Sequence, residues 1–277
     1  MPPRRNPALE LLRSSHPEPV VAVTLLAGIL AVAAGRRTGS VWVVLAVLAG
    51  QLFVGWTNDY GDAGLDARQG RTDKPVAAGT IGRTTVRNAA LTAAALCVPL
   101  SFASGLAAGA THLLAVAIAT AYNLRLKVTV ASVVPYAISF GLLPAFITLG
   151  LPGSPLPAPW VLAAGALLGA GAHFTQSLPD VAADRAQGLG GLPAWIGETG
   201  SALAAAGLLL SAMVAISFGP GHPDLRAGLA IAVAVALAAA IVVLAVRKLP
   251  LAAFRVTLIF AALAVGSLIL NGRSVVG

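Results

Sequence analysis

Two short acidic stretches carry most of the groups in this chain that could do chemistry. Seven of the ten acidic residues fall in NDYGDAGLDARQGRTDKP (58–75) and PDVAADRAQGLGGLPAWIGE (179–198). They are Asp59, Asp62, Asp66, Asp73, Asp180, Asp184 and Glu198. If the helix before Asn58 continues for a turn or two, Asn58, Asp62 and Asp66 share one face, and Asp180 and Asp184 repeat this i, i+4 spacing. Like charges so spaced repel each other, so something must offset the repulsion.

A divalent cation would offset it. Oxygen ligands without accompanying His or Cys favour a hard ion such as magnesium, which usually binds one or two carboxylates and completes its shell with water and substrate phosphates. For a single Asp-x-x-x-Asp, a solvated acidic loop is the better interpretation. Two such clusters, in a chain with so little acid, instead favour a pair of metal sites.

Basic residues near the same segments could bind a diphosphate. Arg68, Arg71 and Lys74 follow the first acidic cluster, and Arg125 and Lys127 lie in AYNLRLK. Arginine offers a bidentate fork to phosphate oxygens, and lysine acts as a point charge. Any one of them alone would be explained by membrane topology or lipid contact. Together with the acidic clusters they predict a polyanion site.

The elements that must position these residues are membrane helices. The chain is 57% hydrophobic and 10% charged, whereas an ordinary soluble domain is about 25% charged. Nine apolar runs recur at roughly 19–35, 41–57, 86–106, 109–124, 128–150, 158–178, 200–218, 227–246 and 251–270. Because every backbone polar group must be satisfied within the hydrocarbon, the runs should be helices. The sequence therefore predicts an all-α polytopic membrane protein, a bundle of nine transmembrane helices around a central cavity.

The positive charges predict an orientation. With a cytoplasmic N-terminus, fourteen of the eighteen Lys and Arg residues fall on the inner side, as the positive-inside rule requires. This places the active-site loops in the cytoplasm and the C-terminus outside. The basic residues are scattered over several short loops with no recognisable binding module, so the sequence predicts no nucleic-acid partner.

The two acidic stretches also align with each other. A shift of 118 residues matches both to D-x-x-x-D-x-x-Q-G-x-x-x-x-P-x-x-x-G. This predicts a single domain over 1–277 with two related halves, about 19–124 and 128–246, and a ninth helix at about 251–270.

These residues resemble the UbiA-type intramembrane prenyltransferases, which join a prenyl diphosphate to an aromatic or other acceptor. The family's N-D-x-x-D-x-x-x-D motif is matched by Asn58, Asp59, Asp62 and Asp66, its R-T-x-x-P element by Arg71, Thr72 and Pro75, its second D-x-x-x-D by Asp180 and Asp184, and a Tyr followed by Lys by Tyr122 and Lys127. Nine helices agree with the family fold, so the likeness spans nearly the whole chain.

The resemblance implies roles for these residues. Magnesium bridging to diphosphate would be held by Asn58, Asp62, Asp66, Asp180 and Asp184. Arg71, Lys127 and Tyr122 would steady the phosphates. Asp59, Arg68, Lys74, Arg125 and Gln176 complete the expected substrate-binding set, and the partners would be a prenyl diphosphate, an aromatic acceptor and membrane lipid.

Two alternatives to prenyl transfer stay open. The same diphosphate site could serve a UbiA-like terpene cyclase, in which the substrate's own double bonds trap the carbocation. A secondary transporter is the alternative from another class, but its ionisable groups should lie near the bilayer midplane. Here the predicted helix interiors contain no Asp or Glu.

Three single residues have mainly structural interpretations. Cys97 is expected to be a small packing residue. His173 is expected to be a packed, hydrogen-bonded histidine. Pro179 is expected to kink the helix that precedes Asp180.

Overall fold

The computed structural model describes residues 6–68, 70–221, 223–270 and 276. Its α-helices are α1 (Pro7–Arg13), α2 (Pro17–Ala33), α3 (Gly39–Arg68), α4 (Arg83–Phe102), α5 (Leu106–Leu124), α6 (Val133–Thr148), α7 (Pro159–Ser177), α8 (Val181–Ala186), α9 (Leu192–Phe218), α10 (Leu225–Val246) and α11 (Pro250–Leu270). A short 3-10 helix, Leu126–Val128, follows α5. The described residues contain no β-strand, only an isolated bridge between Pro157 and Val276, so the all-α prediction is confirmed.

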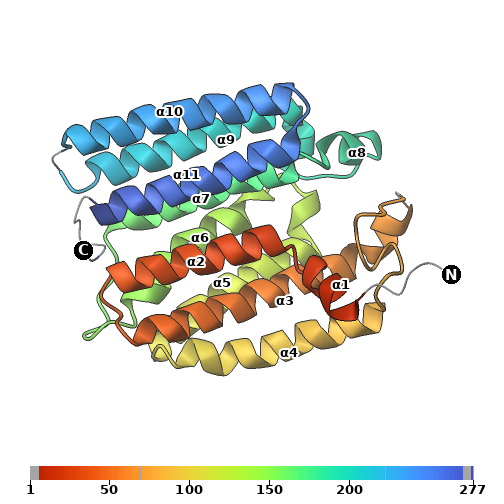
Figure 1. Cartoon of the computed structure of the whole chain (residues 1–277), viewed down its shortest axis with the longest axis horizontal. Helices are drawn as coiled ribbons and strands as arrows, with labels where there is room; N and C mark the ends of the chain where they lie inside the picture. The colour runs from red at the N-terminus through yellow and green to blue at the C-terminus, as the bar shows by residue number, and fades with distance from the viewer. Residues whose placement is uncertain (1–5, 69, 222, 271–275, 277) are drawn as a thin grey trace.

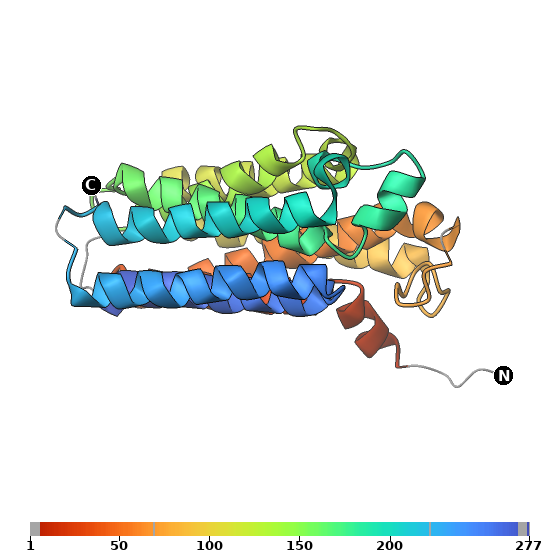
Figure 2. The ribbon, with the colours of Figure 1, turned by 90° about the horizontal axis from the view of Figure 1, so that it is seen from above.

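The long helices run side by side as one bundle (Figure 1). The loop after α3 and the short helix α8 lie at the end of the bundle near α1, and α11 ends at the opposite end (Figures 1 and 2). The two acidic stretches are therefore carried to the same end of the molecule, although α4 to α7 separate them along the chain.

The chain contains many helices fit to cross a bilayer, but the count of nine spans is not confirmed. In the part of the chain that the structure describes, six helices have the necessary length and apolarity, namely α3, α4, α5, α9, α10 and α11. The pair α1 and α2, bent by 69°, would add a seventh if it forms one span. Helix α6 has 16 residues, fewer than the roughly 20 that a span needs. Each of the nine predicted runs nevertheless falls on a helix.

Helix α3 is longer than a membrane crossing requires. Its 30 residues extend about 45 Å at 1.5 Å per residue, whereas the hydrocarbon core is about 30 Å thick. About ten residues of α3 therefore reach beyond the hydrocarbon. We expect the polar segment Asn58–Asp66 to form that part of the helix.

Helices α6 and α7 approach each other closely through glycine. A Cβ on Gly165 would lie 2.7 Å from the Phe140 carbonyl oxygen, and one on Gly169 would lie 2.6 Å from the Tyr136 carbonyl oxygen. Small residues at such contacts let membrane helices pack backbone to backbone. The close packing fixes Tyr136 and Phe140 relative to the end of α7.

Two elements differ from the sequence-based expectation. Helix α1 was not predicted, and it is tied to α3 by a hydrogen bond in which Trp56 Nε1–H donates to the Leu11 carbonyl at 2.8 Å. Its Glu10 is buried and accepts a hydrogen bond from Thr80 Oγ1 in the loop after α3. Helix α9 begins at Leu192, before the predicted 200, and is broken at Gly197, where φ is 77°.

Candidate active site

The first acidic cluster lies on one face of a continuous helix. Because α3 runs to Arg68, Asn58, Asp62 and Asp66 recur at helical spacing, as the sequence predicts. Asn58 Nδ2 donates to Asp62 Oδ2 at 3.0 Å. Asp59 is buried and does not line the cavity described below.

The second acidic cluster sits on a turn between helices. Helix α7 ends at Ser177, so Pro179 lies after the helix and does not kink it as predicted. Asp180 immediately precedes α8, and the Asp184 backbone N–H donates to the Asp180 carbonyl at 2.9 Å. The i, i+4 spacing of the two aspartates is thus helical here as well.

Both clusters face one cavity of about 560 Å³ at this end of the bundle. Ten of the thirteen predicted site residues line it: Asn58, Asp62, Asp66, Arg71, Lys74, Tyr122, Lys127, Gln176, Asp180 and Asp184. Asp59, Arg68 and Arg125 do not, and the side chains of Arg68 and Arg125 are exposed. This placement does not support diphosphate contacts for Arg68 and Arg125.

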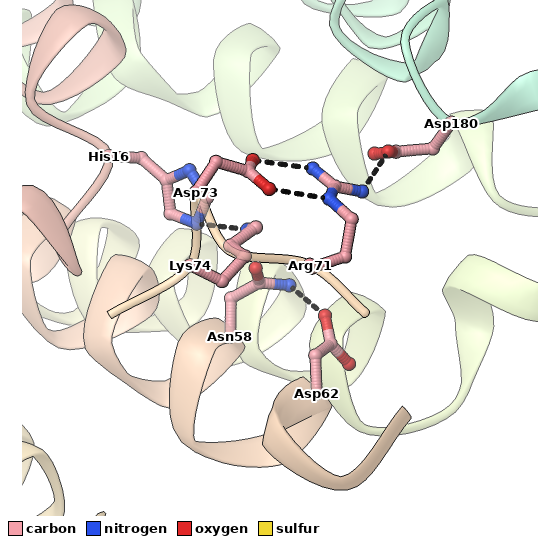
Figure 3. A network of polar contacts seen from close by, with 7 residues as sticks. All are labelled: His16, Asn58, Asp62, Arg71, Asp73, Lys74 and Asp180. Atoms are coloured by element: carbon pink, nitrogen blue, oxygen red, sulfur yellow. Dashed lines mark hydrogen bonds and ion pairs between the residues drawn. The ribbon is translucent and has the colours of Figure 1, made fainter. Parts of the chain in front are cut away.

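Basic side chains connect the two clusters. Arg71 Nη1 lies 2.6 Å from Asp180 Oδ1, while its Nε and Nη2 each donate to Asp73 at 2.9 Å (Figure 3). Lys127, which follows α5, pairs with Asp62. Cations from the first loop and from the end of α5 therefore lie among carboxylates from both halves of the chain.

The surroundings of Asp73 and Asp184 shift the pKa values of these carboxyl groups. Hydrogen bonds from Arg71 lower the pKa of Asp73 to about 2. Burial raises the pKa of Asp184, and the negative charges of Asp180 and Asp62 add to this rise. Asp62 belongs to the first cluster and Asp184 to the second, and both line the same cavity.

Lys74 is held by a residue to which the sequence assigned no role. His16 lies between α1 and α2 with φ 58°, and its Nε2 is 3.2 Å from Lys74 Nζ (Figure 3). An ammonium group only donates, so this nitrogen accepts and the imidazole is neutral. Burial, followed by the charge of Lys74, lowers the pKa of His16 to about 3. The only sequence signal was Pro17, which indicates a helix boundary at the start of the first apolar run.

Replacing His16 by glutamine should reduce the acid sensitivity of the fold. The histidine has a pKa of about 3 in the folded protein and 6.5 when unperturbed. Between these values the unfolded chain binds a proton that the folded chain does not, so the free energy of unfolding falls as the pH falls. Glutamine keeps an acceptor for Lys74 but does not titrate. We expect the thermal midpoint in detergent to drop less between about pH 7.5 and about pH 5 in His16→Gln than in the wild type. Equal drops would contradict this assignment.

Aromatic rings form the inner wall of the cavity. Tyr122 packs edge-on against Tyr136 with ring centroids 5.0 Å apart, and Tyr136 stacks on Phe140 at 6.2 Å. The Tyr136 hydroxyl donates to Gln176 Oε1 at 3.1 Å. His173 is buried beside them, and its Nε2 lies 3.1 Å from Ser132 Oγ. These surroundings agree with the expectation that His173 is a packed, hydrogen-bonded histidine.

The donors present fit magnesium in type. Asp66 Oδ2 is buried and has no hydrogen-bond partner, which is costly for a carboxylate unless a cation approaches it. Among the described residues, no three His, Cys, Asp or Glu side chains stand together closely enough to hold one ion. Lys127 and Arg71 occupy part of the space between the carboxylates. An ion bound here would need water or phosphate oxygens to complete its shell, which is the usual coordination of magnesium.

Comparison with known proteins identifies similar sequences and structures. The sequence profile of the UbiA prenyltransferase family matches residues 20–263. No curated protein sequence matches the chain. A UbiA homologue from Aeropyrum pernix K1 is 19% identical with a TM-score of 0.73, over 92% of this chain and 98% of that one. A UbiA homologue from Archaeoglobus fulgidus, solved with GPP and Mg²⁺, is 16% identical with a TM-score of 0.66, over 94% and 99%. A digeranylgeranylglyceryl phosphate synthase structure is 14% identical with a TM-score of 0.67, over 96% and 98%.

Proposed function

The chain belongs to the UbiA prenyltransferase family, and we propose that it transfers a prenyl group from a prenyl diphosphate to an acceptor within the membrane, with magnesium bound at the two acidic clusters. One observation carries the proposal. Carboxylates from α3 and from the α7–α8 turn face a single cavity that also holds Arg71, Lys74 and Lys127. The Archaeoglobus homologue solved with GPP and Mg²⁺ supports the same pair of ligands here.

The acidic clusters would hold the metal, and the basic residues would hold the phosphates. Asn58, Asp62 and Asp66 on one side and Asp180 and Asp184 on the other present oxygen donors. Magnesium, when bound, neutralises diphosphate and stabilises the negative charge that develops on it. On this proposal the arriving diphosphate takes over the ion pairs that Lys127 and Arg71 now make with Asp62 and Asp180.

The reaction is leaving-group departure followed by capture of a carbocation. The bond between the prenyl C1 and the diphosphate oxygen breaks, and its electron pair leaves with diphosphate. Arg71, Lys74 and Lys127 stabilise that charge because their donors are fixed before the bond breaks. A carbon of the acceptor then bonds to C1, and the acceptor releases a proton.

The aromatic wall suits the second step. The faces of Tyr122, Tyr136 and Phe140 can stabilise a cation-like allylic carbon, and their packing keeps water from capturing it. An electron-rich aromatic ring fits beside these faces by stacking. We therefore propose an aromatic, quinone-precursor-like acceptor.

The orientation and the internal repeat remain part of the proposal. The bundle end that carries the acidic clusters would face the cytoplasm, as the distribution of Lys and Arg predicts, and the C-terminus would lie outside. The halves 19–124 and 128–246 would each supply one acidic turn.

A substrate screen tests the function. The purified protein in lipid nanodiscs is incubated with magnesium, one prenyl diphosphate and one aromatic acceptor, and diphosphate release and product mass are measured. We expect release that depends on magnesium and on the acceptor, and a product with the combined mass of acceptor and prenyl group. Products that lack the acceptor would favour the terpene cyclase. Substrate flux into vesicles without diphosphate release would favour a transporter, and no release with any prenyl diphosphate would refute prenyl transfer.

A further inference from the structure

The site cavity adjoins another space that lies farther from the acidic clusters. A second, smaller cavity of about 50 Å³ shares part of its wall with the first. The shared residues are Val23, Gln51, Val54, Ala119, Ser139 and Phe140. Because these six residues line both spaces, the two cavities adjoin; we refer to them together as the channel and to the shared residues as its neck.

Residue spacings on three helices give nearly the same distance from the diphosphate end to the inner end of the second cavity. Asn58 at the diphosphate end and Val47 at the inner end are eleven residues apart on α3, about 16 Å along its axis. Tyr122 and His112 are ten residues apart on α5, about 15 Å. Tyr136 and Phe146 are likewise ten apart on α6. The inner end of the second cavity therefore lies about 15 Å from the charged end of the bundle.

The inner cavity is lined mainly by apolar side chains, with Gln51, His112 and Ser139 as the polar exceptions. Between the aromatic wall and its inner end, the described lining residues include no Asp, Glu, Lys or Arg. The Ser139 hydroxyl is already used, because it donates to the Ala115 carbonyl at 2.9 Å. A prenyl chain whose diphosphate is held at the acidic clusters would extend into this space by the hydrophobic effect.

A stacked pair of rings lies at the inner end. His112 and Phe146 are the deepest lining residues on α5 and α6, and their rings are 4.5 Å apart and inclined by 22°. His112 is anchored, since its Nδ1 lies 2.7 Å from Ser101 Oγ, which donates to the Cys97 carbonyl at 2.6 Å. Because Ser101 uses its own proton there, His112 Nδ1–H must be the donor in their bond. Phe146 is completely buried. The hydrogen bond of His112 and the complete burial of Phe146 therefore leave these two rings little freedom to move.

We propose that the stacked pair of His112 and Phe146 sets the longest prenyl chain that the enzyme accepts, and that the neck at Ala119 controls access to the inner cavity. This inference rests on the proposed function. One additional methylene in a hydrophobic pocket changes selectivity by about tenfold or more, so a chain one isoprene unit too long should be excluded clearly.

Two variants should move the length limit in opposite directions. Phe146→Ala opens the inner end, and Ala119→Leu fills the neck. With one acceptor and a series of geranyl, farnesyl, geranylgeranyl and longer diphosphates, kcat/KM is measured for each chain. Relative to the best wild-type substrate, we expect Phe146→Ala to improve the next longer chain by at least about tenfold. Ala119→Leu should disfavour the longest accepted chain by a similar factor relative to geranyl diphosphate.

The controls are Ile147→Val and Leu114→Ala. Ile147 is buried next to Phe146 and Leu114 is exposed on α5, and neither lines the channel. Both should keep the wild-type length profile. If Phe146→Ala does not fold, Ala119→Leu decides alone. Unchanged length ratios in the folded variants, or a wild type without any length limit, would overturn the proposal.

A binding measurement separates this result from failure of the proposed function. The rise of the thermal midpoint with each prenyl diphosphate reports occupancy without turnover. A length limit in binding that moves with the variants would support the channel even if no acceptor is found. Absence of binding by any prenyl diphosphate would count against the function itself.

Discussion

Asp62→Ala and Asp180→Ala are each expected to lower magnesium-dependent diphosphate release by at least about a thousandfold. Each residue belongs to a different acidic cluster, and both line the same cavity. On the proposed function, loss of either carboxylate removes a metal ligand, and it also removes an ion-pair partner of Lys127 in one case and of Arg71 in the other. The measurement is diphosphate release at saturating prenyl diphosphate, as a function of magnesium concentration.

A matched control variant tests whether the effect is specific to carboxylates that line the cavity. Glu198 pairs with Lys248 and does not line the cavity, so Glu198→Gln should retain nearly the full rate. The double variant of Asp62 and Asp180 should be little worse than either single variant, because residues that act as a unit are not additive. Full magnesium-dependent turnover in either single variant would refute the metal assignment. Wild-type activity that survives chelation of magnesium would refute it as well.

The acidic clusters were predictable because their spacing is local. Asp62 and Asp66 are one helical turn apart wherever α3 is helical, and the same holds for Asp180 and Asp184 around α8. Local spacing does not reveal that the two clusters meet. The internal repeat and the family resemblance suggested it, and the packing of the helices brings them to one cavity.

The cations that line the cavity were less predictable, since a long side chain can point in several directions. Arg68 and Arg71 are three residues apart, yet Arg68 is exposed and Arg71 reaches Asp180. The difference arises because α3 ends at Arg68 and the chain turns back. At the end of α5, likewise, Lys127 lines the cavity and Arg125 does not. Charge alone could not tell which of each pair enters the cavity.

The N-terminal segment was missed for a physical reason. Its sequence is too short and too polar to register as a membrane element, and its contacts are to residues far along the chain. Glu10 bonds to Thr80, and His16 lies against Lys74. Such long-range polar contacts leave no periodic signal, whereas the apolar runs of the long helices do.

Arg71 is the cation whose loss should affect catalysis most. Its guanidinium is the only described basic group that bridges the loop after α3 and the α7–α8 turn, through Asp73 and Asp180. Asp73 and Asp180 hold the Arg71 guanidinium in the cavity before substrate arrives. The Arg71 side chain therefore loses little conformational freedom when diphosphate binds. We expect Arg71→Ala to lower kcat/KM for the prenyl diphosphate by about a hundredfold or more. Arg71→Lys should recover only part of this, because lysine keeps the charge and loses the bidentate geometry.

Arg83→Ala provides the comparison for Arg71. Arg83 lies over the Tyr60 ring at 4.3 Å and donates to the Tyr60 carbonyl at 3.2 Å, and it does not line the cavity. Both variants lose one positive charge on nearby segments, so a general effect of charge on membrane association or stability should appear in both. A contact with diphosphate should appear in Arg71→Ala alone, as a rise in KM and a fall in kcat with little change in thermal midpoint. If Arg71→Ala is as active as Arg83→Ala, the diphosphate does not contact this guanidinium, and the leaving group must be held by Lys74 and Lys127.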